Sequence, residues 1–129
     1  MHVLRQVHRA LVPSGLLLDV HPLGDEFPVL AGERGIGFVD TRKFRAILEA
    51  MNECVRQVVS ENLFKELGTL RRHVVQRYDT DLEALEEADS WDNLRLPAPV
   101  RRRLQETNAT PIEFIDTVRY RLLAKRGRG

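Results

Sequence analysis

The sequence predicts an α/β domain with a three-stranded mixed sheet flanked by helices, and three observations support this. Leu4, Val7 and Leu11 repeat at helical spacing, and the apolar run Leu16-Leu17-Leu18 that follows is typical of a strand buried on both faces. A second, longer segment has a helical apolar stripe. Alternating apolar residues over 112–122 predict a late strand. A helix that leads into a parallel core strand is typical of an α/β domain.

Residues 24–40 predict a hairpin excursion after the first strand. Two short apolar pieces, Phe27–Leu30 and Ile36–Val39, lie on either side of a turn supplied with glycines. The run Gly32–Gly37 does not follow a strand and open a helix. We therefore expect a hairpin turn there, and no phosphate-binding loop.

The strongest helical pattern follows the hairpin, with Asp40 or Thr41 as the expected N-cap. Its apolar positions lie on one side of the predicted helix: Phe44, Ile47, Leu48, Met51, Cys54, Val55, Val58 and Val59. Because Cys54 belongs to this stripe, we expect a packed thiol there, and no nucleophile.

The rest of the chain predicts an edge strand, two helices and a final strand. Residues 69–78 mix β-branched, aromatic and charged side chains, as a partly exposed edge strand does. Thr80 or Asp81 is expected to cap one short helix, and Pro97 to begin another that ends near Thr107. The final strand is longer and more apolar than 69–78, so we expect it at the centre of the sheet.

Composition fits one globular domain over residues 1–129. The chain is 43% hydrophobic and 30% charged, and its net charge of +1 gives no strong general attraction to nucleic acid or anionic membranes. The basic tail 125–129 and the triplet Arg101-Arg102-Arg103 are therefore expected to be solvated surface. A single cysteine excludes an intrachain disulfide and suits a reducing compartment, and no segment has the length and apolarity of a membrane helix. We expect a cytoplasmic protein.

Asp19 and His21 are the candidate catalytic residues, because ligands of α/β sheets bind beyond the carboxyl ends of parallel strands. A histidine beside a carboxylate can act as a general base, with the carboxylate fixing its tautomer. The alternative is structural: Asp19 caps a turn and His21-Pro22 ends the strand. Tyr78 and Trp91, together with His73, are candidates for lining the same crevice, with core or edge packing as the alternative. No His, Cys or Asp set has metal-binding spacing.

The opening residues resemble the later half of class I S-adenosylmethionine-dependent methyltransferases. In that family a helix ending in His-Arg-x-Leu precedes a Pro-Gly-Gly turn and a strand of Leu and Val. Here His8-Arg9-Ala10-Leu11, Pro13-Ser14-Gly15 and Leu16–Val20 occupy these places, with one glycine missing. The resemblance implies that the last strand lies antiparallel between the two other strands of this half. It also implies S-adenosylmethionine as cofactor, although the family's glycine-rich turn precedes the matched segment and no residue of this chain is assigned to cofactor binding.

Two functions follow as expectations. The first is a methyltransferase-like protein that is inactive without a cofactor-binding half. The second is a non-catalytic, dimeric interaction module derived from the same fold. In both, the Leu16–Leu18 strand has a free edge whose backbone groups need a partner strand. We therefore expect a homodimer or a separate chain that carries the missing half. Binding of nucleic acid through Arg101-Arg102-Arg103 is a third, less favoured alternative.

Overall fold

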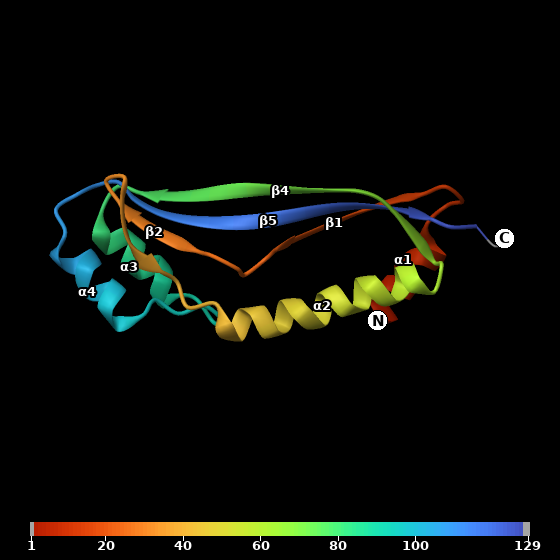
Figure 1. Cartoon of the computed structure of the whole chain (residues 1–129), viewed down its shortest axis with the longest axis horizontal. Helices are drawn as coiled ribbons and strands as arrows, with labels where there is room; N and C mark the ends of the chain where they lie inside the picture. The colour runs from red at the N-terminus through yellow and green to blue at the C-terminus, as the bar shows by residue number, and fades with distance from the viewer. Residues whose placement is uncertain (1, 128–129) are drawn as a thin grey trace. The chain divides into compact units, whose positions relative to one another are not determined.

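A computed structural model describes residues 2–127 of the chain, as helices α1 to α4 and strands β1 to β5 (Figure 1). In chain order the elements are α1 (His2–Ala10), β1 (Leu16–Pro22), β2 (Pro28–Ala31), β3 (Arg34–Phe38), α2 (Arg42–Ser60), β4 (Phe64–Tyr78), α3 (Asp81–Asp89), α4 (Ala98–Glu106) and β5 (Ile112–Lys125). This order agrees with the one predicted, and β4 begins at Phe64 rather than near Thr69. The end of the basic tail, 128–129, lies outside the described residues.

The described residues form two compact units. Among residues 2–127, the first unit draws on 2–22, 47–72 and 118–127, and the second on 23–46 and 73–117. The long elements α2, β4 and β5 contribute to both units.

The prediction of a three-stranded sheet is wrong, because the sheet has five strands. Its order is β1-β5-β2-β3, and β4 also pairs with β5. The additional strands are β2 and β3 of the hairpin. The hairpin is part of the sheet because β2 pairs with the first residues of β5. The last strand therefore has strands on both sides, as expected for a central strand.

The prediction of a mixed sheet is also wrong, because the sheet is antiparallel. β1 runs antiparallel to β5, with Leu17 opposite Leu123. β4 runs antiparallel to β5 too, since Arg77 contacts Glu113 while His73, earlier in β4, contacts Thr117, later in β5.

In the first unit, β1 buries one face only. Leu16 and Leu18 are 56% and 57% exposed, whereas Leu17 packs against the core. Figure 1 shows α1 and α2 on one side of the strands of this unit, and Leu17 packs against the core cluster that includes Val55 and Val58 of α2. The unbroken leucine run suggested burial on both faces, because a strand buried on one face usually alternates apolar and polar residues and this run does not.

The core of the first unit is small and joins α2, β4 and β5. It consists of Val55, Val58, Phe64 and Leu123, with Leu4, Leu11, Leu17, Val59 and Leu63 packed against it. By contrast, β4 has exposed side chains from Lys65 to Arg77. This exposure agrees with the edge character predicted for the strand.

The second unit packs the hairpin and β5 against α3 and α4. Its core includes Val29, Ile36, Leu104, Ile112 and Phe114. The Thr80 hydroxyl accepts a bond from the Glu83 N–H and so caps α3, while α4 follows Pro97. Both helix starts agree with the sequence signals that predicted them.

The start of α2 is fixed by Asp40. Its carboxylate accepts bonds from the Arg42 guanidinium and from the Arg42 backbone N–H, and these bonds lower the pKa of Asp40 to about 2. The neighbouring Thr41 is buried and donates its hydroxyl to the Gly24 carbonyl at 2.7 Å. No helix within the described part of the chain is long and apolar enough to cross a membrane.

Candidate functional site

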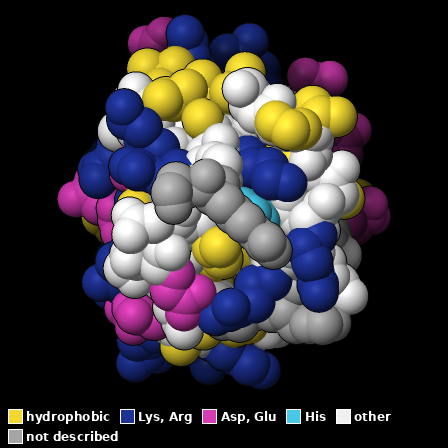
Figure 2. Space-filling model, turned by 90° about the vertical axis from the view of Figure 1, so that its right-hand side faces the viewer, with side chains coloured by type: hydrophobic (Ala, Val, Ile, Leu, Met, Phe, Trp, Pro, Cys, Tyr) yellow, Lys and Arg dark blue, Asp and Glu magenta, His cyan; other side chains and the backbone are white. Residues whose placement is uncertain are grey.

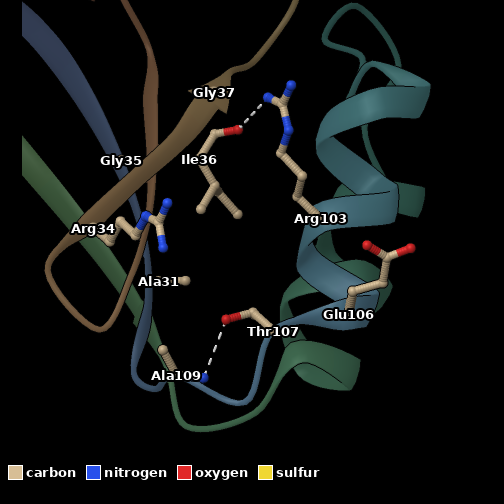
Figure 3. A pocket seen from close by; sticks show the side chains of 9 residues that line it. All are labelled: Ala31, Arg34, Gly35, Ile36, Gly37, Arg103, Glu106, Thr107 and Ala109. Atoms are coloured by element: carbon tan, nitrogen blue, oxygen red, sulfur yellow. Dashed lines mark hydrogen bonds between the residues drawn. The ribbon is translucent and has the colours of Figure 1, made fainter.

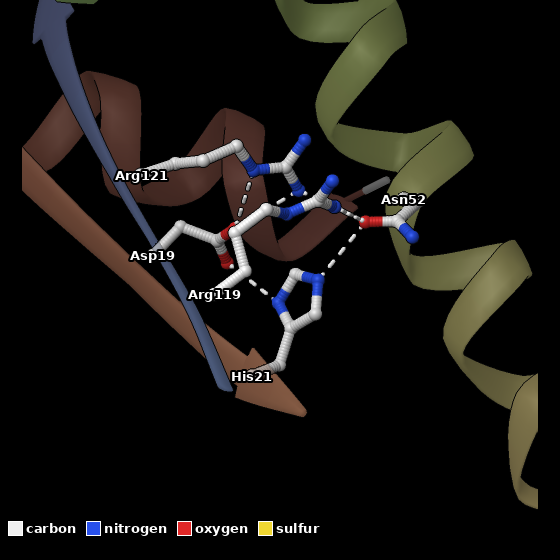
Figure 4. Close-up of polar contacts among 5 residues, drawn as sticks. All are labelled: Asp19, His21, Asn52, Arg119 and Arg121. Carbon is white, nitrogen blue, oxygen red and sulfur yellow. Dashed lines mark hydrogen bonds and ion pairs between the residues drawn. The ribbon is translucent and has the colours of Figure 1, made fainter. Parts of the chain in front are cut away.

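Two polar residues of β1 lie on the helix-facing side of the first unit. Asp19 and His21 are two and four positions beyond Leu17, so the period of a strand gives all three the same face. The antiparallel register then places Asp19 opposite Arg121 and His21 opposite Arg119 on β5. The helix α2 supplies a fifth residue, Asn52. We call these five residues the polar cluster (Figure 4).

Asp19 and Arg121 form the central ion pair of the polar cluster. Arg121 Nε and Nη2 each lie 3.0 Å from Asp19 Oδ2. The Arg121 side chain is buried, with 7% of the residue exposed. A guanidinium that is buried away from water requires an opposite charge close by, and the Asp19 carboxylate provides it.

His21 is held at both ring nitrogens. Its Nδ1 lies 3.2 Å from Asp19 Oδ1, and its Nε2 lies 2.9 Å from Asn52 Oδ1. Asn52 Oδ1 also accepts bonds from Arg121 Nη2 at 3.1 Å and from Arg119 Nη2. This oxygen can only accept, so it faces His21 Nε2 and both guanidiniums as an acceptor.

This arrangement bears on the chemistry expected of His21. The residue is 4% exposed, and both of its ring nitrogens are already engaged by other residues of the polar cluster. The contact with Asp19 favours a structural role for the pair. A catalytic role for Asp19 and His21 stays a prediction.

The polar cluster carries more positive than negative charge. Asp19 is its single carboxylate, and it faces two guanidiniums. Burial lowers the pKa of Arg119, and the charge of Arg121 lowers it further. Arg119 Nε is buried and has no hydrogen-bond partner among the described residues.

The predicted substrate-lining residues lie in the second unit. Trp91 packs against Phe114 with ring centroids 5.2 Å apart, and Tyr78 packs against the same ring at 5.5 Å. Burial raises the pKa of Tyr78, and the charge of Glu87 adds to this. His73 contacts the Thr117 hydroxyl at 3.2 Å. These contacts are those of packing residues, and a substrate-binding role for Tyr78 and Trp91 stays a prediction.

Sequence reasoning missed Asn52, Arg119 and Arg121. Arg119 and Arg121 are two positions apart on a strand, as Asp19 and His21 are, and this spacing was the available signal. It becomes informative only once the register of β1 on β5 is known.

Comparisons with family models, with curated proteins and with solved structures found no match to the chain. Among the described residues, no three His, Cys, Asp or Glu side chains lie close enough together to hold a metal ion. The function must therefore be argued from the fold and the polar cluster alone.

Proposed function

We propose that the chain is the later half of a class I S-adenosylmethionine-dependent methyltransferase domain, and that it acts with a cofactor-binding half. The observation that carries this proposal is the position of β5. It pairs with both β1 and β4, and it runs antiparallel to each. The resemblance found in the sequence implies this placement of the last strand between the two others.

The free edge of β1 supports a role for a second half. β1 is the terminal strand in the order β1-β5-β2-β3, so its outer edge pairs with no other strand within 2–127. Leu16, Leu18 and Val20 on this strand are largely exposed. An unpaired edge beside exposed apolar side chains favours the addition of another strand.

The surface of the first unit supports the same proposal. Figure 2 looks at the end of the molecule where α1 lies, and hydrophobic side chains gather along its upper part, with Lys and Arg side chains around them. Leu67 and Leu70, on the part of β4 that belongs to this unit, are also exposed. Large exposed apolar patches mark interaction surfaces in many proteins.

The described residues do not fit S-adenosylmethionine. The only glycine-rich run among them, Gly32–Gly37, joins two antiparallel strands and does not lead from a strand into a helix. The phosphate- and nucleotide-binding turns of α/β domains require that strand–turn–helix order. In our proposal the complementary half holds the cofactor, and this chain completes the sheet.

Calorimetric titration with S-adenosylmethionine tests the proposal in two arms. The chain alone is expected to give no binding heat. A glycine-rich strand–turn–helix segment encoded upstream of Met1 or by a neighbouring gene, co-purified with this chain, is expected to bind the cofactor with about micromolar affinity, near −8 kcal/mol. Cofactor binding by the isolated chain, or failure of such a segment to form a complex, would contradict the proposal.

The exposed apolar residues also favour the second function, a dimeric interaction module without catalysis. In that case the purified chain is expected to have twice the monomer mass in light scattering at micromolar concentration, and to keep that mass when a cofactor-binding half is present. A monomer that associates only with the complementary half would exclude the module.

A further inference from the structure

A hollow of about 680 Å³ lies in the second unit, between β3 and α4. Its volume is within the range of small-molecule sites, about 300–1,000 Å³. Arg34, Gly35, Ile36 and Gly37 line it from the hairpin (Figure 3). The other wall is formed by α4 and the residues after it: Arg103, Glu106, Thr107 and Ala109.

A β-bulge shapes the hairpin wall. Val29 pairs with Gly37 and Leu30 with Gly35, so Ile36 is an extra residue on β3. The Ile36 side chain is buried, while its carbonyl accepts a bond from Arg103 Nη1 at 2.8 Å. Bulges often lie beside binding sites, where they redirect the backbone.

Gly37 limits the hollow at one end. Its φ is +147°, and a Cβ at this position would lie 2.5 Å from Val100 Cγ2 on α4. Only glycine permits this close approach of β3 to the helix. β3 and α4 are therefore in close contact at this end of the hollow.

Two guanidiniums approach the hollow from its opposite walls. Arg34 extends from β3 into the hollow (Figure 3), and within 2–127 its guanidinium has no hydrogen bond or ion pair. Arg103 is held through Nη1, which leaves Nε and Nη2 available as donors. An anchored guanidinium opposite a free one suits an anion, because each can donate in a fork to phosphate or carboxylate oxygens.

The remaining polar groups agree with this. Thr107 Oγ1 accepts a bond from the Ala109 N–H at 3.1 Å, which leaves its hydroxyl hydrogen free to donate. The Glu106 carboxylate points away from Arg34 (Figure 3). We propose that this hollow binds a small molecule through a phosphate or carboxylate group, held between Arg34 and Arg103. The site lies within the second unit and is independent of the proposed methyltransferase function.

NMR titration of the full chain tests the site, with inorganic phosphate and succinate as separate probes at constant ionic strength. Saturable shifts are expected at the backbone amides of Gly35, Gly37 and Thr107. Arg34→Gln is expected to weaken binding by about tenfold, because it removes one charged donor that has no structural contact. The probe that saturates at the lower concentration identifies the ligand group.

Arg102→Gln is the matched control, since Arg102 is an exposed residue of α4 that does not line the hollow. It removes the same charge and is expected to leave both affinities unchanged. Shifts that fail to saturate with both probes would overturn the proposal, as would equal weakening by Arg34→Gln and Arg102→Gln. Arg103→Gln alone would not decide the question, because it also removes the contact with Ile36.

Discussion

At the scale of single residues, Asn52 organises the polar cluster. Its side-chain oxygen accepts bonds from His21, Arg119 and Arg121, which come from two strands. Without this oxygen, the buried donors of His21 and Arg121 would each lose an acceptor. A neutral amide of α2 therefore links the helix to β1 and β5.

Asn52→Leu is expected to destabilise the chain by about 2–4 kcal/mol, because buried charged donors are left without a partner. Asn52→Asp keeps an acceptor at the same place and adds a negative charge beside two guanidiniums. We expect its stability to be within about 1 kcal/mol of the parent chain. Urea unfolding followed by circular dichroism measures both. Equal stability of Asn52→Leu and the parent chain would show that the polar cluster contributes nothing to the fold.

The carboxyl of Asp116 leads to a prediction about how the stability of the chain depends on pH. Burial raises the pKa of this half-buried carboxyl above 3.8, while a bond from the Thr117 N–H opposes the shift. A carboxyl whose pKa is raised by folding stabilises the folded chain. This contribution is fully present at pH values below the pKa of the unfolded chain, and it is lost as pH rises through the pKa of the folded chain.

Asp116→Asn is therefore expected to raise the urea midpoint at pH 7 and to give no gain near pH 3. The amide keeps an oxygen for the Thr117 N–H, so the local bond survives. Asp92→Asn removes the same charge at an exposed position and controls for the change in net charge. A lower midpoint for Asp116→Asn at pH 7 would contradict the assigned effect of burial.

The sequence could predict part of the polar cluster. Asp19 and His21 are two positions apart on one strand, so their common face follows from the strand period alone. The contacts with Arg119 and Arg121 depend on the register between two distant segments. Asp19 and Arg121, for example, are 102 positions apart in the sequence. Such a register follows from the packing of the whole unit, which no local pattern specifies.

At the scale of elements, β1 has two faces of different character. Leu17 packs against the core of the first unit, whereas Leu18 is exposed. The proposed partner surface is the exposed face and the free edge of this strand. Substitutions at adjacent positions can therefore separate folding from association.

Leu18→Lys is expected to leave the folded structure intact and to abolish association with a second half or a second copy. Leu17→Lys is expected to destabilise the chain by several kcal/mol, because it buries a charge in the core. Circular dichroism measures folding, and light scattering measures association. If Leu18→Lys associates as the parent chain does, the exposed face of β1 is not the interface.

The strand β5 shows why alternation alone misassigned some core residues. The predicted apolar face used even positions, from Ile112 to Leu122. Ile112 and Phe114 are indeed buried, but further along the strand the buried residues are Arg121 and Leu123. The change from even to odd positions occurs where β5 passes from the second unit to the first. A pattern that assumes one buried face along the whole strand cannot anticipate this change.

The element order was predictable because local signals mark most boundaries. Thr80 caps α3, Pro97 precedes α4, and the glycines of the hairpin supply its turn. The strand count was not predictable in the same way. Whether β2 and β3 join the main sheet depends on the pairing of β2 with Glu113 and its neighbours in β5, which is a tertiary contact.

At the scale of the whole molecule, each unit is assembled from separated segments. The first unit uses three segments of the chain and the second uses two. Neither unit corresponds to a continuous stretch, so no linker in the sequence marked the division. The methyltransferase-like function stays a prediction that rests on a resemblance, because the described residues supply a strand arrangement and no cofactor-binding turn.

The pairing of β1 with β5 has a consequence for synthesis of the chain. Leu16–Pro22 is synthesised before its partner residues 118–124, and Asp19 and Arg121, which face each other across this pair of strands, are 102 positions apart. Until residues 118–124 are synthesised, β1 lacks the strand with which it pairs in the folded unit. Contacts between distant segments form slowly, and unpaired apolar strands aggregate, so we expect the nascent chain to be prone to aggregation during this interval.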